Sequence, residues 1–394
     1  MSSLSHRDIS CGLITAACLL VLNIIYVSSF TGFIHPPGAV LETDHFHYIE
    51  MARGLNIAGS RLAYVPPFCW RLFTPYLTFR LTAFGIDLNT AYYLISNIFL
   101  FGLLYIIFCY LRKSGFNLCY SLAGMILAGL TPGTVRWYEY QYWMTDPAGL
   151  FFIFLAFYLI KIKRDRYLYP LSVIAVTNRG AFLIILVYYF FHLLKIYGWK
   201  HALTRTITLS VAPLVVLALI HHYIPLSRGH DIGAVLKQTL EFRLKYLWFN
   251  QLYLLTVGSF GIIFPLLLLF PSSILKYCRR EYDSFLFILL VYAQLLVANN
   301  TSRLLVYALP VLLPAALRNL KQFSFQTRLS SQFLLAVIIA LQIVFYIGTP
   351  FYGIAAVSVF QSTNLTVVFA SALFWLSAVT ARGFLPLSTK RKKM

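Results

Sequence analysis

The chain has 394 residues, of which 60% are hydrophobic and 11% are charged. Soluble domains carry about 25% charged residues, and compact domains of roughly 100–200 residues cannot bury this much apolar side chain. The composition therefore excludes a water-soluble enzyme and predicts an integral membrane protein. The 32 Lys and Arg residues outnumber the 12 Asp and Glu residues. Cytoplasmic loops of membrane proteins collect such cations, so this excess does not indicate nucleic acid as a partner.

Apolar runs near the ~20 residues that cross a bilayer follow one another along the chain. Two shorter runs, at 167–177 and 181–195, are split by Thr177-Asn-Arg-Gly. They predict a broken helical pair whose break lies in protein or lines a cavity. We expect an all-α polytopic fold of about twelve transmembrane or membrane-embedded helices, without a large soluble domain. The longer runs are at 10–30, 89–111, 117–134, 147–162, 206–225, 251–271, 283–299, 303–318, 330–348 and 362–381.

The charges predict the orientation. With the N-terminus in the cytoplasm, alternation through these crossings places 21 of the 32 cations inside, including the clusters at 161–166 and 390–393. This asymmetry follows the positive-inside rule. Eight of the 12 carboxylates and six of the nine histidines fall outside. We therefore expect the functional chemistry on the outer face.

Two outer connections are long. The first, at 31–88, is the longest, and the second, at 226–250, mixes Arg, Lys and aromatic residues. The second is typical of an interfacial amphipathic helix, for which a simple membrane anchor is the ordinary explanation. The six cysteines show no CxxC or zinc spacing, so the sequence predicts no metal ligands of that kind.

A candidate general base lies in the first outer loop. If Asp44 opens a helix there, His47, Tyr48 and Met51 share its face by their spacing. A carboxylate at the membrane surface beside an imidazole and a phenol has the chemistry of a general base. The alternative is that Asp44 merely caps a surface helix.

Further candidates lie in two aromatic runs. Arg71, in Pro66-Pro-Phe-Cys-Trp-Arg-Leu-Phe-Thr-Pro, either holds an anion near the headgroups or snorkels to the interface. Glu139 and Asp146 lie among five aromatic residues between the third and fourth crossings. An aromatic belt does not account for these acids, whereas rings beside carboxylates form a sugar-binding surface. Asp146 precedes Pro147, so capping of the fourth helix is the alternative.

Arg179 is the strongest single candidate for a functional residue, because an ionisable group at a helix break within the membrane costs free energy unless it has a partner. The alternative is structural pairing with Glu139 or Asp146. Arg303, which follows Asn299-Asn-Thr-Ser, is a similar case. The pair His221 and His222 either binds phosphate or a metal, or simply lies at the headgroups.

In their order and common sidedness, these features resemble the GT-C superfamily of polytopic glycosyltransferases, which use lipid-phosphate-linked sugars. The shared features are a cytoplasmic N-terminus, an acidic residue in a long first outer loop, an aromatic-Arg-Pro run, a second acidic site and short broken helices; here they are carried by Asp44, Arg71, Glu139, Asp146 and Arg179. The resemblance covers residues 1–200, as a catalytic module, and leaves 201–394 as the variable half. The chain departs from the pattern in having one Asp at the first site and no large outer C-terminal domain.

The resemblance implies inverting transfer of a sugar from a polyprenyl or dolichyl phosphate to an acceptor hydroxyl of a glycan or glycolipid on the outer face. Asp44 would be the base, oriented by His47 or Tyr48. Preorganised cations would stabilise the departing lipid phosphate; the candidates are Arg71, Arg179, Arg303, His221 and His222. The candidates for acceptor or sugar binding are His47, Tyr48, Glu50, Glu139, Tyr142 and Asp146. No cofactor is expected, and a divalent cation is left open.

Two other functions are consistent with the composition. A transporter or flippase of a lipid-linked or anionic substrate would need ionisable residues near mid-membrane, and often related halves. A polysaccharide polymerase or ligase would share the outer arginine chemistry.

For the compartment, we expect a bacterial inner membrane with the site facing the periplasm. The alternative is the endoplasmic reticulum with a lumenal site, since the tail Lys390-Arg-Lys-Lys-Met fits a retrieval pattern.

Overall fold

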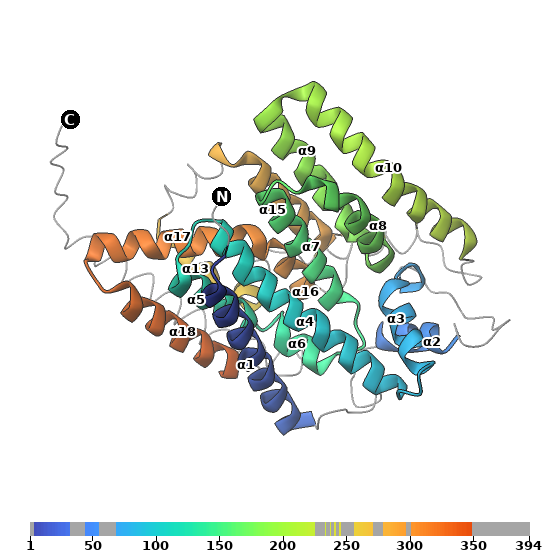
Figure 1. Cartoon of the computed structure of the whole chain (residues 1–394), viewed down its shortest axis with the longest axis horizontal. Helices are drawn as coiled ribbons and strands as arrows, with labels where there is room; N and C mark the ends of the chain where they lie inside the picture. Colours follow the sequence, from blue (N-terminus) through green and yellow to red (C-terminus); the bar gives the residue numbers. More distant parts are fainter. Residues whose placement is uncertain are drawn as a thin grey trace.

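The computed structural model describes residues 4–31, 44–54, 68–224, 256–270, 279–296 and 301–348, with six single positions between 233 and 245. Within these residues all regular structure is helical and no strand occurs (Figure 1), so the expected all-α fold is confirmed. The expected amphipathic helix at 226–250, apart from those single positions, and the expected crossing at 362–381 lie outside the described residues.

The helices follow the predicted order, with several short helices between the long ones. The long helices are α1 (His6–Thr31), α4 (Leu88–Lys113), α10 (Trp199–Tyr223), α17 (Leu309–Thr327) and α18 (Ser331–Gly348). The shorter helices are α2 (Asp44–Gly54), α3 (Phe73–Thr82), α5 (Leu118–Gly129), α6 (Val135–Tyr140), α7 (Asp146–Lys161), α8 (Leu168–Asn178), α9 (Leu183–Tyr197), α13 (Ile263–Leu268), α15 (Tyr282–Ala293) and α16 (Thr301–Leu305). Single 3₁₀ turns include η2 (Phe68–Trp70), η3 (Asp165–Tyr167), η4 (Gly180–Phe182) and η6 (Val306–Ala308).

Six helical segments of the described residues are long and apolar enough to cross a membrane, which supports the expectation of a membrane protein. They are His6–Phe30, Leu88–Lys113, Gly180–Tyr197, Trp199–Tyr223, Arg303–Thr327 and Ser331–Gly348. Helix α5 and the segment Tyr282–Leu296 are apolar but shorter.

Burial separates central helices from peripheral ones. Helix α4 packs against α1, α3, α5 and α7. In the segment Arg303–Thr327, 83% of the most apolar 18-residue stretch is buried. By contrast, α10 packs along α8 and α9, and 17% of its most apolar 18-residue stretch is buried. Figure 1 shows α10 at the edge of the bundle. In a bilayer, α10 is therefore a lipid-facing helix.

The first outer loop contains more structure than the sequence predicted. A helix does begin at Asp44, as expected, but α3 was not anticipated. Helix α3 packs against α4 and α8, and α2 packs against α3. Asp87 then caps α4, because its Oδ2 atom accepts hydrogen bonds from the backbone N–H groups of Asn89 and Thr90, both at 3.1 Å.

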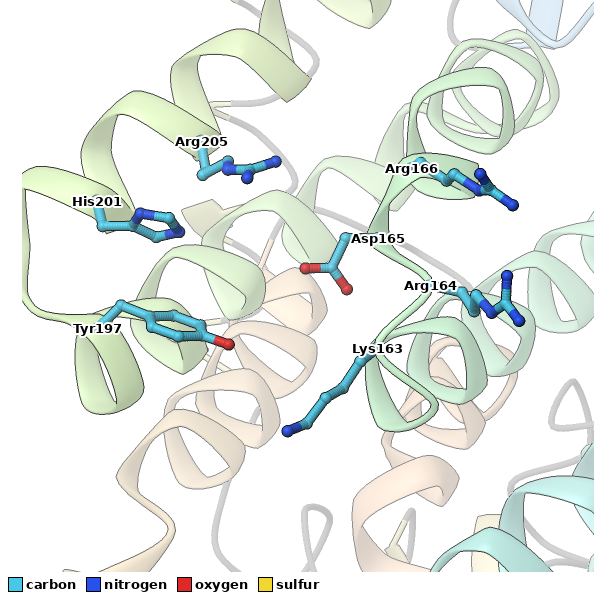
Figure 2. A pocket seen from close by; sticks show the side chains of 7 residues that line it. All are labelled: Lys163, Arg164, Asp165, Arg166, Tyr197, His201 and Arg205. Atoms are coloured by element: carbon cyan, nitrogen blue, oxygen red, sulfur yellow. The ribbon is translucent and has the colours of Figure 1, made fainter. Parts of the chain in front are cut away.

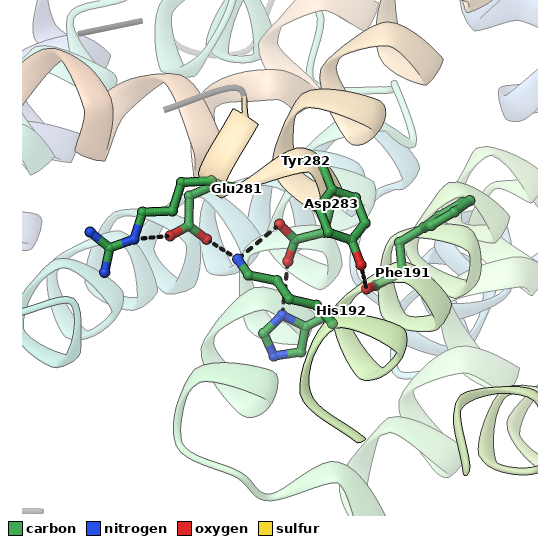
Figure 3. A network of polar contacts seen from close by, with 7 residues as sticks. Phe191, His192, Glu281, Tyr282 and Asp283 are labelled. Carbon is green, nitrogen blue, oxygen red and sulfur yellow. Dashed lines mark hydrogen bonds and ion pairs between the residues drawn. The ribbon is translucent and has the colours of Figure 1, made fainter. Parts of the chain in front are cut away.

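Each ion pair of the described residues joins residues that the sequence analysis assigns to the same membrane face. At the end predicted to face the cytoplasm, Lys195 of α9 binds Glu281 and lies 3.5 Å from Oδ1 of Asp283. His192 Nδ1 lies 3.0 Å from Oδ2 of Asp283 (Figure 3). Lys195 thus bridges two carboxylates and links α9 to α15.

Buried amides link helices that are distant in the chain. Asn319 of α17 donates to the carbonyl oxygens of Leu266 and Leu267, at 3.2 and 3.0 Å. Gln342 of α18 donates to the carbonyl of Leu130 and accepts from the backbone N–H of Ile262, both at 2.9 Å. These side chains satisfy backbone groups at the end of α5 and in the segment 262–267.

Candidate functional site

Two arginines that the sequence analysis names as separate candidates, Arg179 and Arg303, lie at the carboxylate of Asp146, and a third, Arg71, lies near Arg179. Arg179 Nη1 donates a hydrogen bond to Asp146 Oδ1, and Arg303 Nη1 lies 3.7 Å from Oδ2. Arg71 lies within electrostatic reach of Arg179. The side chains of Asp146, Arg303 and Arg179 are 0%, 5% and 12% exposed. Counting only these four side chains, the formal charge is 3 − 1 = +2.

Local hydrogen bonds bring these arginines together. The backbone N–H of Leu72 donates to the carbonyl of Thr177 at 2.7 Å. Thr74 Oγ1 donates to Asn178 Oδ1 at 2.8 Å, and Asn178 Nδ2 donates to the carbonyl of Thr145 at 2.9 Å. The end of α8 is thereby tied both to the start of α3, beside Arg71, and to the start of α7.

The break between α8 and α9 is partly buried: Asn178 is fully buried and Arg179 is half-buried, whereas Gly180 is exposed. Arg179 leaves α8 in extended conformation, with φ −161° and ψ 121°. Pairing with Asp146, one of the two partners considered for Arg179, is present. Gly149 provides the space, because a Cβ atom there would lie 2.9 Å from the hydroxyl of Tyr307 and 3.8 Å from Arg179 Cδ.

Arg71 connects the cluster to α2. Its Nη1 atom donates a hydrogen bond to Tyr48 Oη, and its guanidinium carbon lies 5.9 Å from the centre of the same ring. Tyr48 is fully buried, and its carbonyl accepts from Tyr92 Oη of α4 at 2.6 Å. Asp44 begins α2 one turn before Tyr48. The helix predicted to carry the base is therefore anchored to the arginine cluster, although the side chain of Asp44 lies outside the described residues.

Several buried hydroxyls around the cluster have no hydrogen-bond partner within the described residues. They belong to Tyr138, Thr145 and Tyr307. The ring centre of Tyr307 lies 5.6 Å from the guanidinium carbon of Arg179. Tyr138 is fully buried, within electrostatic reach of Arg179 and Arg303. Buried polar groups are normally paired, so these three are suited to water or to the oxygens of a ligand.

Tyr138, Tyr307, Asn178 and Thr74 were missed as site residues in the sequence. Tyr307 lies four residues after Arg303, which is one turn in a helix and was a usable signal. Tyr138 belongs to a run with several tyrosines, and nothing in the spacing distinguishes it from Tyr140 or Tyr142.

Glu139 and Tyr142, predicted to bind acceptor or sugar, have other described partners than the arginines. Glu139 is buried beside Asn97 and Tyr93 of α4. Tyr142 is fully buried, with its ring 4.0 Å from that of Trp143 and 5.4 Å from that of Tyr93. The two predicted acidic residues thus have different environments, since Asp146 lies with the arginines.

The remaining candidates lie toward the surface. His47 is half-buried and Glu50 is exposed, both on α2. His221 and His222 are exposed at the end of α10. The ring of His221 lies 4.0 Å from that of Trp70, which directly precedes Arg71, and the ring of His222 packs against Tyr223. Within the described residues, no three His, Cys, Asp or Glu side chains are grouped as metal ligands.

Glu139 gives a prediction for pH. Burial raises the pKa of Glu139 to about 8, against the opposing effects of Asn97 and Tyr93. Between the unfolded pKa near 4.5 and this value, the folded protein holds a proton that the unfolded chain releases. The Glu139 contribution to stability is therefore lost as the pH rises through this range. We expect Glu139→Gln to flatten the fall in thermal midpoint from pH 5 to pH 9, measured in detergent. Equal slopes for both proteins would contradict this environment.

No protein-family model matches the chain, and a comparison with curated proteins also finds no match.

Proposed function

We propose that the protein is an inverting glycosyltransferase of GT-C type, a hexosyl- or pentosyltransferase. Its donor is a sugar linked to a polyprenyl phosphate, and its acceptor is a hydroxyl of a glycan or glycolipid at the outer face of the membrane. The observation that carries this proposal is the grouping of three arginines, with Arg179 and Arg303 at the carboxylate of Asp146 and Arg71 near Arg179. Guanidinium groups are planar donors that suit the oxygens of a phosphate monoester or diester, so such a group is an anion that this cluster can bind.

The arginine cluster is preorganised for a leaving group. Asn178 accepts a hydrogen bond from Thr74 and donates one to the carbonyl of Thr145, which holds the segments that carry Arg71 and Arg179, so these cations need little rearrangement when charge develops. Fixed donors in a site with little water are the strongest source of electrostatic stabilisation in enzymes. The unpaired hydroxyls of Tyr138 and Tyr307 supply further donors for phosphate oxygens. Asp146 has the role of a counter-ion that keeps two guanidinium groups apart and oriented.

The proposed reaction balances with the residues named. The acceptor oxygen forms a bond to the anomeric carbon while its proton passes to the carboxylate of Asp44. The bond between the anomeric carbon and the phosphate oxygen breaks, and its electron pair stays on the lipid phosphate. Attack from the side opposite the phosphate inverts the configuration. His47 or Tyr48 would orient the base; the hydrogen bond from Arg71 to Tyr48 supports a position for α2 beside the phosphate.

The membrane arrangement completes the proposal. We infer about twelve crossings with a catalytic module at 1–200, a variable half at 201–394 and a periplasmic site in a bacterial inner membrane. The endoplasmic reticulum, with a lumenal site, is the alternative. No cofactor is required by this scheme, which leaves a divalent cation open. The ion pairs of the described residues are consistent with the alternation on which this topology rests.

The decisive experiment compares transfer with translocation in vesicles that contain the purified protein. Tritiated polyprenyl-phosphate hexoses and pentoses are supplied with extracted membrane glycolipids as acceptors. We expect label to move to the acceptor, and unlabelled undecaprenyl phosphate to inhibit it. Movement of the intact donor across the bilayer without any transfer would instead establish the flippase alternative.

A further inference from the structure

A second charged site lies at the opposite end of the bundle from the arginine cluster. A cavity of about 530 Å³ is lined on one side by residues 163–166, between α7 and α8. Its other side is formed by Tyr197 of α9 with His201 and Arg205 of α10. Figure 2 shows Lys163 extending toward the side of Tyr197, and the carboxylate of Asp165 between the two walls. The glycosyltransferase proposal makes no use of this cavity.

The cavity carries excess positive charge. Four cations line it, Lys163, Arg164, Arg166 and Arg205, against one carboxylate, so the formal charge is 4 − 1 = +3 with His201 neutral. In the described part of the chain, none of the four has a carboxylate within ion-pair distance. Tyr189 Oη holds Asp165 at 2.8 Å and thereby fixes one wall to α9. An anion in the cavity would restore the balance.

The backbone of Lys163 supports a role for its side chain. Lys163 adopts φ 58°, in the left-handed region that glycine and asparagine occupy most readily. A lysine here therefore has no conformational advantage. The ordinary explanation for Arg164 and Arg166, which point away from the facing wall in Figure 2, is a solvated cytoplasmic loop. A solvated loop accounts least well for the other two cations, Lys163 and Arg205.

The surroundings of the cavity are those of a membrane interface. Tyr197 and Trp199, at the turn from α9 to α10, are 55% and 59% exposed, and Tyr167 is 46% exposed. Such aromatic residues are enriched where the headgroups lie. Beyond Arg205, α10 exposes Val211, Val215 and Leu219 along its length. The charged cavity thus adjoins an apolar helix surface that can accommodate acyl chains.

We propose that this cavity binds the phosphate headgroup of an anionic phospholipid from the cytoplasmic leaflet. Lys163 and Arg205 contact the phosphate, Arg164 and Arg166 add long-range attraction, and the acyl chains lie along α10. Basic pockets between membrane helices on this side are suited to such headgroups, and arginine suits phosphate in particular.

The test uses the full-length protein in detergent and native mass spectrometry, with phosphatidylglycerol and phosphatidylcholine as probes. The wild type is expected to retain phosphatidylglycerol at least about tenfold more tightly than phosphatidylcholine. The variant Lys163→Gln/Arg205→Gln is expected to lose this preference. The matched control Lys321→Gln/Arg328→Gln removes two exposed charges of the predicted inner face elsewhere and is expected to keep it.

The outcomes separate the possibilities. Equal lipid binding by the variant and the control, or equal binding of both lipids by the wild type, overturns the proposal. Displacement of the lipid by millimolar inorganic phosphate overturns the assignment to a lipid, because the cavity would then select a soluble anion. Arg205→Glu is a second variant at an exposed position, in case the double variant does not fold. Loss of sugar transfer by Asp44→Asn leaves this result unaffected.

Discussion

Replacement of Asp44 by Asn is expected to reduce sugar transfer by about 10²–10⁴-fold, which is the usual contribution of a positioned general base. The amide keeps the size of the side chain but cannot accept the proton of the attacking hydroxyl. Helix α2 is held by Tyr48, through Arg71 and Tyr92, so the variant is expected to fold. Initial rates in vesicles with tritiated donor, beside binding of undecaprenyl phosphate, give the measurement.

The control for this prediction is Glu241→Gln, a carboxylate-to-amide change at an exposed position on the same predicted face. We expect the control to transfer sugar at the wild-type rate. Asp44→Asn is expected to keep its affinity for undecaprenyl phosphate, since the arginines remain. Retained transfer in the Asp44 variant would remove this residue from the mechanism.

Replacement of Arg179 by Gln is expected to have two separable effects. Loss of one preorganised cation at the leaving phosphate lowers the transfer rate by about 10²–10³-fold. The change also leaves the fully buried carboxylate of Asp146 without its hydrogen-bonded partner. Breaking a buried pair in this way costs about 3–5 kcal/mol of stability. Transfer rates and thermal midpoints in detergent measure the two effects on the same preparations.

A double variant distinguishes a functional Arg179 from a structural one. In Arg179→Gln/Asp146→Asn the buried charge is removed together with its partner, so the thermal midpoint is expected to recover. Transfer and undecaprenyl phosphate binding are expected to stay low, because the cation is still absent. Recovery of both stability and transfer would show that the pair only supports the fold. Arg179→Lys is expected to fold but to transfer slowly, since an ammonium lacks the planar fork of the guanidinium.

The elements that sequence predicts well are those set by length and apolar composition. The apolar run at 89–111 predicted α4, and the interruption at Thr177-Asn-Arg-Gly predicted the break between α8 and α9. Helix α3 was missed because ten residues are too few for a crossing and its surroundings are rich in proline. Its position depends on tertiary bonds, such as that from Thr74 to Asn178, which no local pattern encodes.

For the candidate site, the sequence indicated which side chains share a membrane face but not which of them meet. Alternation of the crossings put Arg71, Arg179 and Arg303 on one side, and their charge made them candidates. The choice of Asp146 over Glu139 as the partner could not be predicted. The two acids are seven residues apart, and the short helix α6 and the turn after it direct one toward α4 and the other toward Arg179.

The buried amides of Asn319 and Gln342 have a consequence for assembly in the bilayer. Lipid tails are as apolar as leucine, so hydrophobic surface alone gives a helix little reason to prefer protein neighbours over lipid. Directional bonds that reach the main chain of another segment, at Leu130, Ile262 and Leu266, do discriminate. A helix shifted by one residue would leave these amides unpaired inside a dry interior. The late helices are therefore held in register by a few polar side chains. A substitution such as Gln342→Leu would make α18 more apolar and still able to enter the bilayer, but would remove the hydrogen bonds that fix its register.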